Sequence, residues 1–172
     1  LIQNLLPLEG LAILASPSGE KKTWVALHMA YCIAMGKDFL GHEDFKTQKS
    51  KVLYLDQEMS RAELQRRGKL LGFSAETEGL IIPVDFQQID LSKDEYLDWL
   101  LKQVIEHDVR VIFIDTLRAV AGGLREDKAE EVREFLNKFL SFKKMGLCII
   151  FLDHCRKAHP FEGKVPKKEQ LL

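Results

Sequence analysis

Two lysines and a threonine stand where the sequence predicts the start of a helix, and they are the residues best suited to bind an anion. Residues 16–36 read SPSGEKKTWVALHMAYCIAMG, and the apolar spacing from Thr23 onward predicts an amphipathic helix that ends at Gly36. The unpaired N–H groups and the positive dipole end of a first helical turn disfavour cations such as Lys21 and Lys22. An anion bound at this helix end would remove the conflict.

The same segment matches the phosphate-binding pattern G-x-x-x-x-G-K-[ST] at its lysine and hydroxyl positions. The residues that align with the pattern, and that we expect to surround the phosphates, are Ser16, Pro17, Ser18, Gly19, Glu20, Lys21, Lys22 and Thr23. In this interpretation Lys22 contacts the β- and γ-phosphates of ATP, Thr23 binds Mg²⁺, and backbone N–H groups hold the phosphates. The alternative is a polar turn with solvated lysines. The position between a buried strand and a helix favours the phosphate-binding loop.

Both glycines that define the pattern are replaced, by Ser16 and Lys21. In the pattern, the glycine directly before the lysine lets the chain adopt whatever φ the loop requires. Lys21 has a Cβ atom, so a left-handed conformation there would cost roughly 1–2 kcal/mol. We therefore expect a loop that is distorted or mobile without phosphate, and weaker nucleotide binding than in a loop with both glycines.

Two further candidate residues, Asp115 and Glu58, are carboxylates that each lie at or just beyond the end of an apolar run. Asp115 closes the run VRVIFID and suits a Mg²⁺ ion held through water. Thr116 follows it, where many ATPases with this loop carry a catalytic glutamate, so a hydrolytic enzyme would need its base elsewhere. Glu58, just beyond the run KVLYLD, is the candidate for that base. The alternative is that Glu58 is an N-terminal charge that stabilises a helix dipole.

Further polar residues follow the remaining runs. His154 ends the last run and suits either contact with a γ-phosphate or a purely structural role, which the sequence supports about equally. Asp56 is interpreted as a hydrogen-bonding group at a strand end, and Asp85 could join the same edge. A local basic stretch then follows, with Arg156, Lys157, Lys164, Lys167 and Lys168. It suits a nucleic-acid backbone or, equally, a solvated loop.

Alternating strands and helices must bring these residues together. Apolar runs predict strands at 11–15, 51–56, 80–84, 109–115 and 147–153, the first buried on both faces and the third an edge or strand end because of Pro83. Helical patterns cover 22–35, 60–71, 92–107 and 127–144, with capping boxes at 60–63 and 92–95. This order predicts an α/β fold with a mainly parallel central sheet, whose strands present their carboxyl ends at one ligand-binding edge.

The length and composition of the chain limit the number of domains, the classes of partner and the cellular compartment. The 172 residues fit one domain, and 25 basic against 26 acidic side chains give no overall field that would indicate nucleic acid or a membrane as partner. The three cysteines are odd in number, which indicates a reducing compartment and a cytoplasmic protein. No apolar run approaches the ~18 residues of a membrane span. The start at Leu1 and the closing KVPKKEQLL lead us to expect a fragment of a longer protein.

Together these segments resemble the core of RecA-like ATPases, and most closely the RepA-type branch of hexameric replicative helicases. The similar segments are LAILASPSGEKKTWVALHMA, KVLYLDQEMSRAELQRR, VIFIDTLRAVAGGLRED and CIIFLDHCRK, in the family's order and spacing. The resemblance implies a site of Lys22 on phosphate, Thr23 and Asp115 on Mg²⁺, Glu58 activating water and His154 sensing phosphate. Asp153 departs from the family, which often has a histidine at that position.

The resemblance also implies an organisation and a function. Residues 1–172 would form a single RecA-like ATPase domain, incomplete at its C-terminal end, with later strands and an arginine finger beyond Leu172. ATP and Mg²⁺ would be the cofactors, single-stranded DNA a partner, and a homo-oligomeric ring the full-length assembly, without a membrane. The function would be that of an ATP-hydrolysing helicase motor in a replication or mobile-element protein. The alternative is a regulatory module that binds nucleotide without hydrolysis, while a small-molecule kinase lacks an evident lid or acceptor site.

Overall fold

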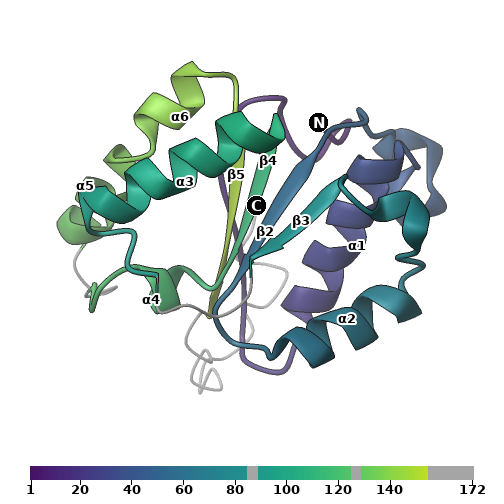
Figure 1. Cartoon of the computed structure of the whole chain (residues 1–172), viewed down its shortest axis with the longest axis horizontal. Helices are drawn as coiled ribbons and strands as arrows, with labels where there is room; N and C mark the ends of the chain where they lie inside the picture. The colour runs from purple at the N-terminus through teal and green to yellow at the C-terminus, as the bar shows by residue number, and fades with distance from the viewer. Residues whose placement is uncertain (85–88, 125–128, 155–172) are drawn as a thin grey trace, which may run out of the picture.

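In a computed structural model of the chain, residues 1–84, 89–124 and 129–154 are described, and they form a five-stranded parallel sheet between two layers of helices (Figure 1). The strands are β1 (Gly10–Ser16), β2 (Val52–Asp56), β3 (Ile81–Val84), β4 (Val111–Asp115) and β5 (Cys148–His154). The helices are α1 (Lys22–Met35), α2 (Arg61–Leu70), α3 (Asp94–His107), α4 (Leu117–Val120), α5 (Ala129–Asn137) and α6 (Leu140–Lys144), with 3₁₀ turns η1 (Phe39–Gly41), η2 (Glu43–Phe45) and η3 (Ala75–Thr77). The predicted fold class is confirmed.

The strand order, β1-β5-β4-β2-β3, decides which polar residues become neighbours. All four pairings are parallel, so the strands present their carboxyl ends at the same edge. At that edge the register places Asp56 opposite Asp115, and Ser16 opposite His154. Asp115 is opposite Leu152 of β5, so the second pair lies two residues further along than the first, and both pairs share one edge of the sheet.

The apolar runs are explained by burial on both faces of the sheet. Helices α1 and α2 cover one face, and α3, α5 and α6 cover the other (Figure 1). Tyr54 of β2 and Phe113 of β4 point into the first layer, while Leu55 and Ile114 point into the second. Within the described ranges, no helix is long and apolar enough to cross a membrane.

The first strand and the first helix differ from the prediction. Ile13 of β1 is 48% exposed, because β1 forms the outer edge of the described sheet and is not buried on both faces as expected. Helix α1 has the expected bounds and ends at Gly36 in a left-handed conformation. It is not amphipathic, however, since Val25 is its one exposed residue and the rest of its circumference packs against other elements.

The predicted capping boxes are only partly formed. Ser60 caps α2 by accepting a hydrogen bond from the Glu63 N–H, but the Glu63 carboxylate binds two arginines of the helix and does not reach back to the cap. The second box is wrong. The Ser92 hydroxyl donates to Asp90, and α3 begins one residue later than a Ser92 cap would allow, after Lys93.

The helix expected at 127–144 is two helices in the part that the structure describes. Between α5 and α6, the N–H groups of Lys138 and Phe139 donate to carbonyls three residues back, which tightens the chain. Phe139 is thereby buried completely and packs edge-on against Phe151 of β5. Core packing thus overrides the continuous helical periodicity of this segment.

Gly68 provides a test of the packing of α2. A Cβ atom built on Gly68 would lie 2.8 Å from Cδ2 of Phe73, which is closer than such atoms pack. Alanine normally stabilises a helix by roughly 1 kcal/mol over glycine, but overpacking costs typically ~1–3 kcal/mol. We expect Gly68→Ala to lower the melting temperature in a thermal denaturation measurement.

The exposed Lys69→Ala variant is the matched control and should leave the melting temperature nearly unchanged. Adding Phe73→Leu should restore part of the stability lost in Gly68→Ala. A melting temperature for Gly68→Ala at or above that of the wild type would contradict the proposed overlap.

Candidate functional site

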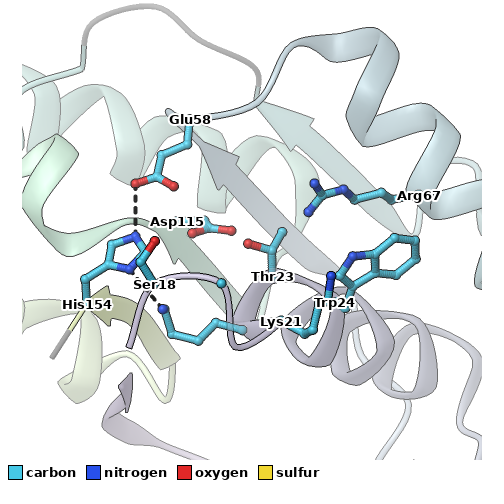
Figure 2. A pocket seen from close by; sticks show the side chains of 10 residues that line it. Ser18, Lys21, Thr23, Trp24, Glu58, Arg67, Asp115 and His154 are labelled. Atoms are coloured by element: carbon cyan, nitrogen blue, oxygen red, sulfur yellow. Dashed lines mark hydrogen bonds and ion pairs between the residues drawn. The ribbon is translucent and has the colours of Figure 1, made fainter. Parts of the chain in front are cut away.

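A cavity of about 220 Å³ lies at the carboxyl edge of the sheet (Figure 2). Its lining residues are Ser18, Gly19, Lys21, Lys22, Thr23, Trp24, Glu58, Arg67, Asp115 and His154. Every residue that the sequence assigns to catalysis or to metal binding is among them. Of the predicted phosphate loop, Ser16, Pro17 and Glu20 are outside this lining.

The loop achieves its turn without the second glycine. Lys21 adopts φ 63° and ψ 23°, a left-handed conformation, and Gly19 two residues earlier has φ 88°. The structure thus contains the conformation whose cost we considered for Lys21. This conformation costs the folded chain roughly 1–2 kcal/mol relative to an unstrained residue.

Lys22 is held by the loop itself. Its side chain is buried, with only 6% of the residue exposed. The ammonium donates hydrogen bonds to the carbonyl oxygens of Ser16, at 2.9 Å, and Pro17, at 3.3 Å. It also lies 3.0 Å from Nδ1 of His154. A phosphate that binds Lys22 must therefore compete with backbone carbonyls that already satisfy the charge.

His154 connects this lysine to the predicted base. An ammonium can only donate, so Nδ1 of a neutral His154 accepts from Lys22 and the ring proton lies on Nε2. That nitrogen is 3.5 Å from Oε1 of Glu58 (Figure 2). The hydroxyl of Thr116 donates to the same oxygen at 3.1 Å. Glu58 is thus oriented from two sides, by residues that follow β4 and end β5.

Asp56 has the structural role expected of it. One carboxylate oxygen accepts hydrogen bonds from the N–H groups of Glu58 and Met59, both at 2.8 Å. The other oxygen is buried and has no partner among the described residues. Burial raises the pKa of Asp56, and the two N–H groups oppose that change. These bonds fix the turn that carries Glu58 into the cavity.

Asp115 is a buried carboxyl at the floor of the site. It is 2% exposed, and the hydroxyl of Tyr54 donates to its Oδ2 at 3.2 Å. Burial is the main cause that raises the pKa of Asp115 from 3.8 to about 6, with further contributions from the charges of Asp56 and Glu58. Hydrogen bonds from Thr23 and Tyr54 act in the opposite direction.

Thr23 and Asp115 fit a Mg²⁺ ion. They offer a hydroxyl and a carboxylate side by side, and a cation would offset the buried negative charge. In the described part of the chain, no group of three or more His, Cys, Asp or Glu side chains could hold a metal. Mg²⁺ is usually bound by one or two protein ligands and completed by water and phosphate oxygens, so Thr23 and Asp115 would suffice as its protein ligands.

Four residues of the site were not identified from the sequence. Arg67 and Trp24 lie at the side of the cavity opposite His154, with the guanidinium 5.3 Å from the centre of the indole ring (Figure 2). The Glu63–Arg67 spacing predicts an ion pair on a helix, and this pair is formed at 2.7 Å, but spacing alone cannot show that Arg67 faces the site. The sequence gave no signal for Tyr54 or for the contact of Thr116 with Glu58, because both contacts join segments that are far apart in the chain. Asp85 and the basic stretch at 156–168 lie outside the described residues.

The sequence profile of a family described as AAA domain matches residues 1–160. Among solved structures, the fold is similar to that of a KaiC-like protein from the hyperthermophilic archaeon Pyrococcus horikoshii OT3, with 24% sequence identity and a TM-score of 0.62. The match covers 90% of this chain and 65% of that structure, so the chain spans just under two thirds of its length. No curated protein matches the chain. At this identity the structural match supports the RecA-like fold.

The left-handed Lys21 leads to a prediction about stability. Glycine at this position would remove the steric cost of roughly 1–2 kcal/mol but lose about 0.5–1 kcal/mol through the entropy of the unfolded chain. We expect Lys21→Gly to be more stable than Lys21→Ala, by up to about 1.5 kcal/mol, in urea denaturation. Both variants lose the ammonium, so their difference reports the backbone alone. A Lys21→Ala variant that is clearly more stable than Lys21→Gly would show that the loop does not keep this conformation in solution.

Asp115 leads to a prediction about pH. A carboxyl whose pKa is higher in the folded than in the unfolded chain disfavours folding once it is ionised. The effect is absent below about pH 3.8, grows up to about pH 6 and is constant above it. A difference of about 2 in pKa corresponds to about 3 kcal/mol as an upper bound. We expect Asp115→Asn to unfold at a higher temperature than the wild type at pH 8 without nucleotide, and at a similar temperature near pH 4.

The exposed Asp98→Asn variant on α3 is the control, and it should show no gain that grows with pH. If Asp115→Asn were less stable than the wild type at pH 8, the carboxylate would be contributing more through its hydrogen bonds than burial removes.

Proposed function

The chain belongs to the AAA domain family, and on this basis we propose that it binds ATP with Mg²⁺ and hydrolyses it as a RecA-like motor domain. The observation that supports this most directly is the convergence of Lys22, Glu58 and Asp115 on one cavity at the carboxyl edge. These residues come from three separate segments of the chain. A polar turn with solvated lysines would not bury Lys22 or bring both carboxylates to it.

Lys22 and Thr23 would bind the triphosphate. The ammonium of Lys22 exchanges the carbonyls of Ser16 and Pro17 for oxygens of the β- and γ-phosphates. Thr23 and Asp115 would hold the Mg²⁺ ion, which would supply neutralisation of the charge on the phosphate oxygens. The left-handed Lys21 adds a second ammonium to the lining, where it contributes attraction for phosphate that a glycine could not.

Glu58 would act as the general base. Its side chain is 45% exposed, so a water molecule can reach it, and hydrogen bonding from Thr116 restricts where its carboxylate points. A positioned carboxylate that takes a proton from the attacking water typically contributes ~10²–10⁴-fold to the rate. Thr116 stands where many such ATPases carry the catalytic glutamate and cannot itself act as a base. Glu58 would act as the base instead, and the hydroxyl of Thr116 orients its carboxylate.

His154 would report whether phosphate is present. In the described structure its two ring nitrogens face Lys22 and Glu58. When Lys22 moves to the phosphates, Nδ1 of His154 loses its donor. The ring can then rotate toward the γ-phosphate, and Glu58 is released from it toward water.

The cavity would enclose only part of a nucleotide. Its volume of about 220 Å³ is below the ~300–1,000 Å³ of pockets that surround small ligands. The phosphates would occupy this cavity, and the base would lie toward Trp24 and Arg67, where a planar guanidinium and an indole offer stacking surfaces. A second copy in a ring would complete the site.

We propose that the motor moves along single-stranded DNA as part of a helicase in a replication or mobile-element protein.

A regulatory module that binds ATP without hydrolysis is the second candidate. The strain at Lys21 and the occupied ammonium of Lys22 favour it, because both are features of a loop that is not prepared for phosphate. The two candidates agree on binding and differ on phosphate release.

Substitution of Glu58 separates these functions. We expect Glu58→Gln to bind ATP with Mg²⁺ as the wild type does and to lose roughly 10²-fold or more in the rate of phosphate release. The assay measures phosphate release with and without single-stranded DNA, and calorimetric titration measures binding. The exposed Glu106→Gln variant on α3 is the matched control and should behave as the wild type.

Three outcomes decide between the candidates. Loss of binding in Lys22→Ala, together with loss of turnover alone in Glu58→Gln, supports the ATPase. A wild type that binds ATP but releases no phosphate under either condition supports the regulatory module. Phosphate release that single-stranded DNA does not accelerate contradicts the helicase assignment.

A further inference from the structure

Tyr54 places a phenol inside the sheet layer, at a position where a hydrocarbon side chain would suffice for packing. It is 1% exposed, and its ring stacks on Phe113 with centroids 5.7 Å apart and planes inclined by 18°. Phenylalanine would make the same ring contact. The hydroxyl therefore needs an explanation of its own, because a buried polar group that lacks a hydrogen-bond partner destabilises the fold.

The register of the sheet gives that explanation. Tyr54 is paired with Phe113 across β2 and β4, and Asp115 lies two residues further along β4 on the same face. Such diagonal neighbours are within reach of an aromatic side chain. The hydroxyl of Tyr54 reaches Oδ2 of Asp115 at 3.2 Å, in the buried interior.

The hydrogen bond runs in one direction. The phenol has a proton to donate and a carboxylate oxygen can only accept, so the hydroxyl of Tyr54 is the donor to Asp115. Asp115 receives hydrogen bonds from Tyr54 and from Thr23. If the Thr23 hydroxyl turns to a Mg²⁺ ion, Tyr54 becomes the donor that keeps the carboxylate in place.

We propose that Tyr54 is a positioning residue for the Mg²⁺ site: its hydroxyl fixes the orientation of the Asp115 carboxylate from behind, on the side away from the phosphates. This inference rests on the proposed function, since it assumes that Thr23 and Asp115 hold the ion. Partners of this kind orient metal-binding carboxylates, and their loss typically weakens metal binding ~10–100-fold.

The test is Tyr54→Phe, which removes one oxygen and keeps the ring. Calorimetric titration measures ATP affinity without Mg²⁺, and a MgCl₂ titration at fixed ATP measures the Mg²⁺ concentration at half-maximal effect. We expect that concentration to rise about 10-fold, with ATP affinity in the absence of Mg²⁺ unchanged. Adding Tyr54→Phe to Asp115→Asn should have no further effect, because the hydroxyl acts through this carboxylate.

Tyr31→Phe is the matched control. Its hydroxyl accepts a hydrogen bond from Lys37 at 2.7 Å, far along α1 from the loop, so its removal should leave the Mg²⁺ titration unchanged. An unchanged Mg²⁺ titration in Tyr54→Phe would overturn the inference. So would an equal loss of affinity with and without Mg²⁺, which marks a general structural effect. A wild type whose ATP binding does not respond to Mg²⁺ would instead refute the proposed metal site itself.

Discussion

Parallel alignment of the strands is the constraint on which the site depends. Backbone hydrogen bonding within the sheet fixes the register. The register sets the last residues of β2 and β4 opposite each other, and those of β1 and β5 opposite each other two residues further along, at the same edge of the sheet. Strands buried on both faces are nearly continuous apolar runs. Polar side chains are therefore concentrated at the edge where each strand leaves the core. That edge is where the lysine, the two carboxylates and the histidine of the candidate site lie close together.

The same constraint brings buried carboxylates close together, and neighbouring hydrogen-bond donors offset part of the cost. Asp56 and Asp115 are paired across neighbouring strands and are both buried. Backbone N–H groups satisfy one oxygen of the first, and hydroxyls satisfy the second. Lys22, the buried cation nearby, is turned to carbonyls and His154. A cation and a polyanion arriving together would suit both halves of this arrangement.

The strands and most of the site could be predicted from the sequence because both depend on local patterns. Apolar runs that end in polar residues mark buried parallel strands, and spacing around Lys22 marks the loop. Properties that depend on neighbouring elements could not be predicted. The exposure of Ile13 follows from which strand lies at the edge, and the break at Phe139 follows from an aromatic cluster. The contacts of Tyr54 and Thr116 follow from register, which no short pattern encodes.

The hydrogen bonds between the Lys22 ammonium and the carbonyls of its own loop have a consequence for the rate of nucleotide binding. If a triphosphate can enter only after the ammonium leaves the carbonyls of Ser16 and Pro17, the unoccupied protein exists mainly in a form that cannot accept it. The observed affinity is then the intrinsic affinity reduced by the fraction of open molecules. Association would proceed through that minor population, and its observed rate would level off at high nucleotide concentration at the rate at which the loop opens.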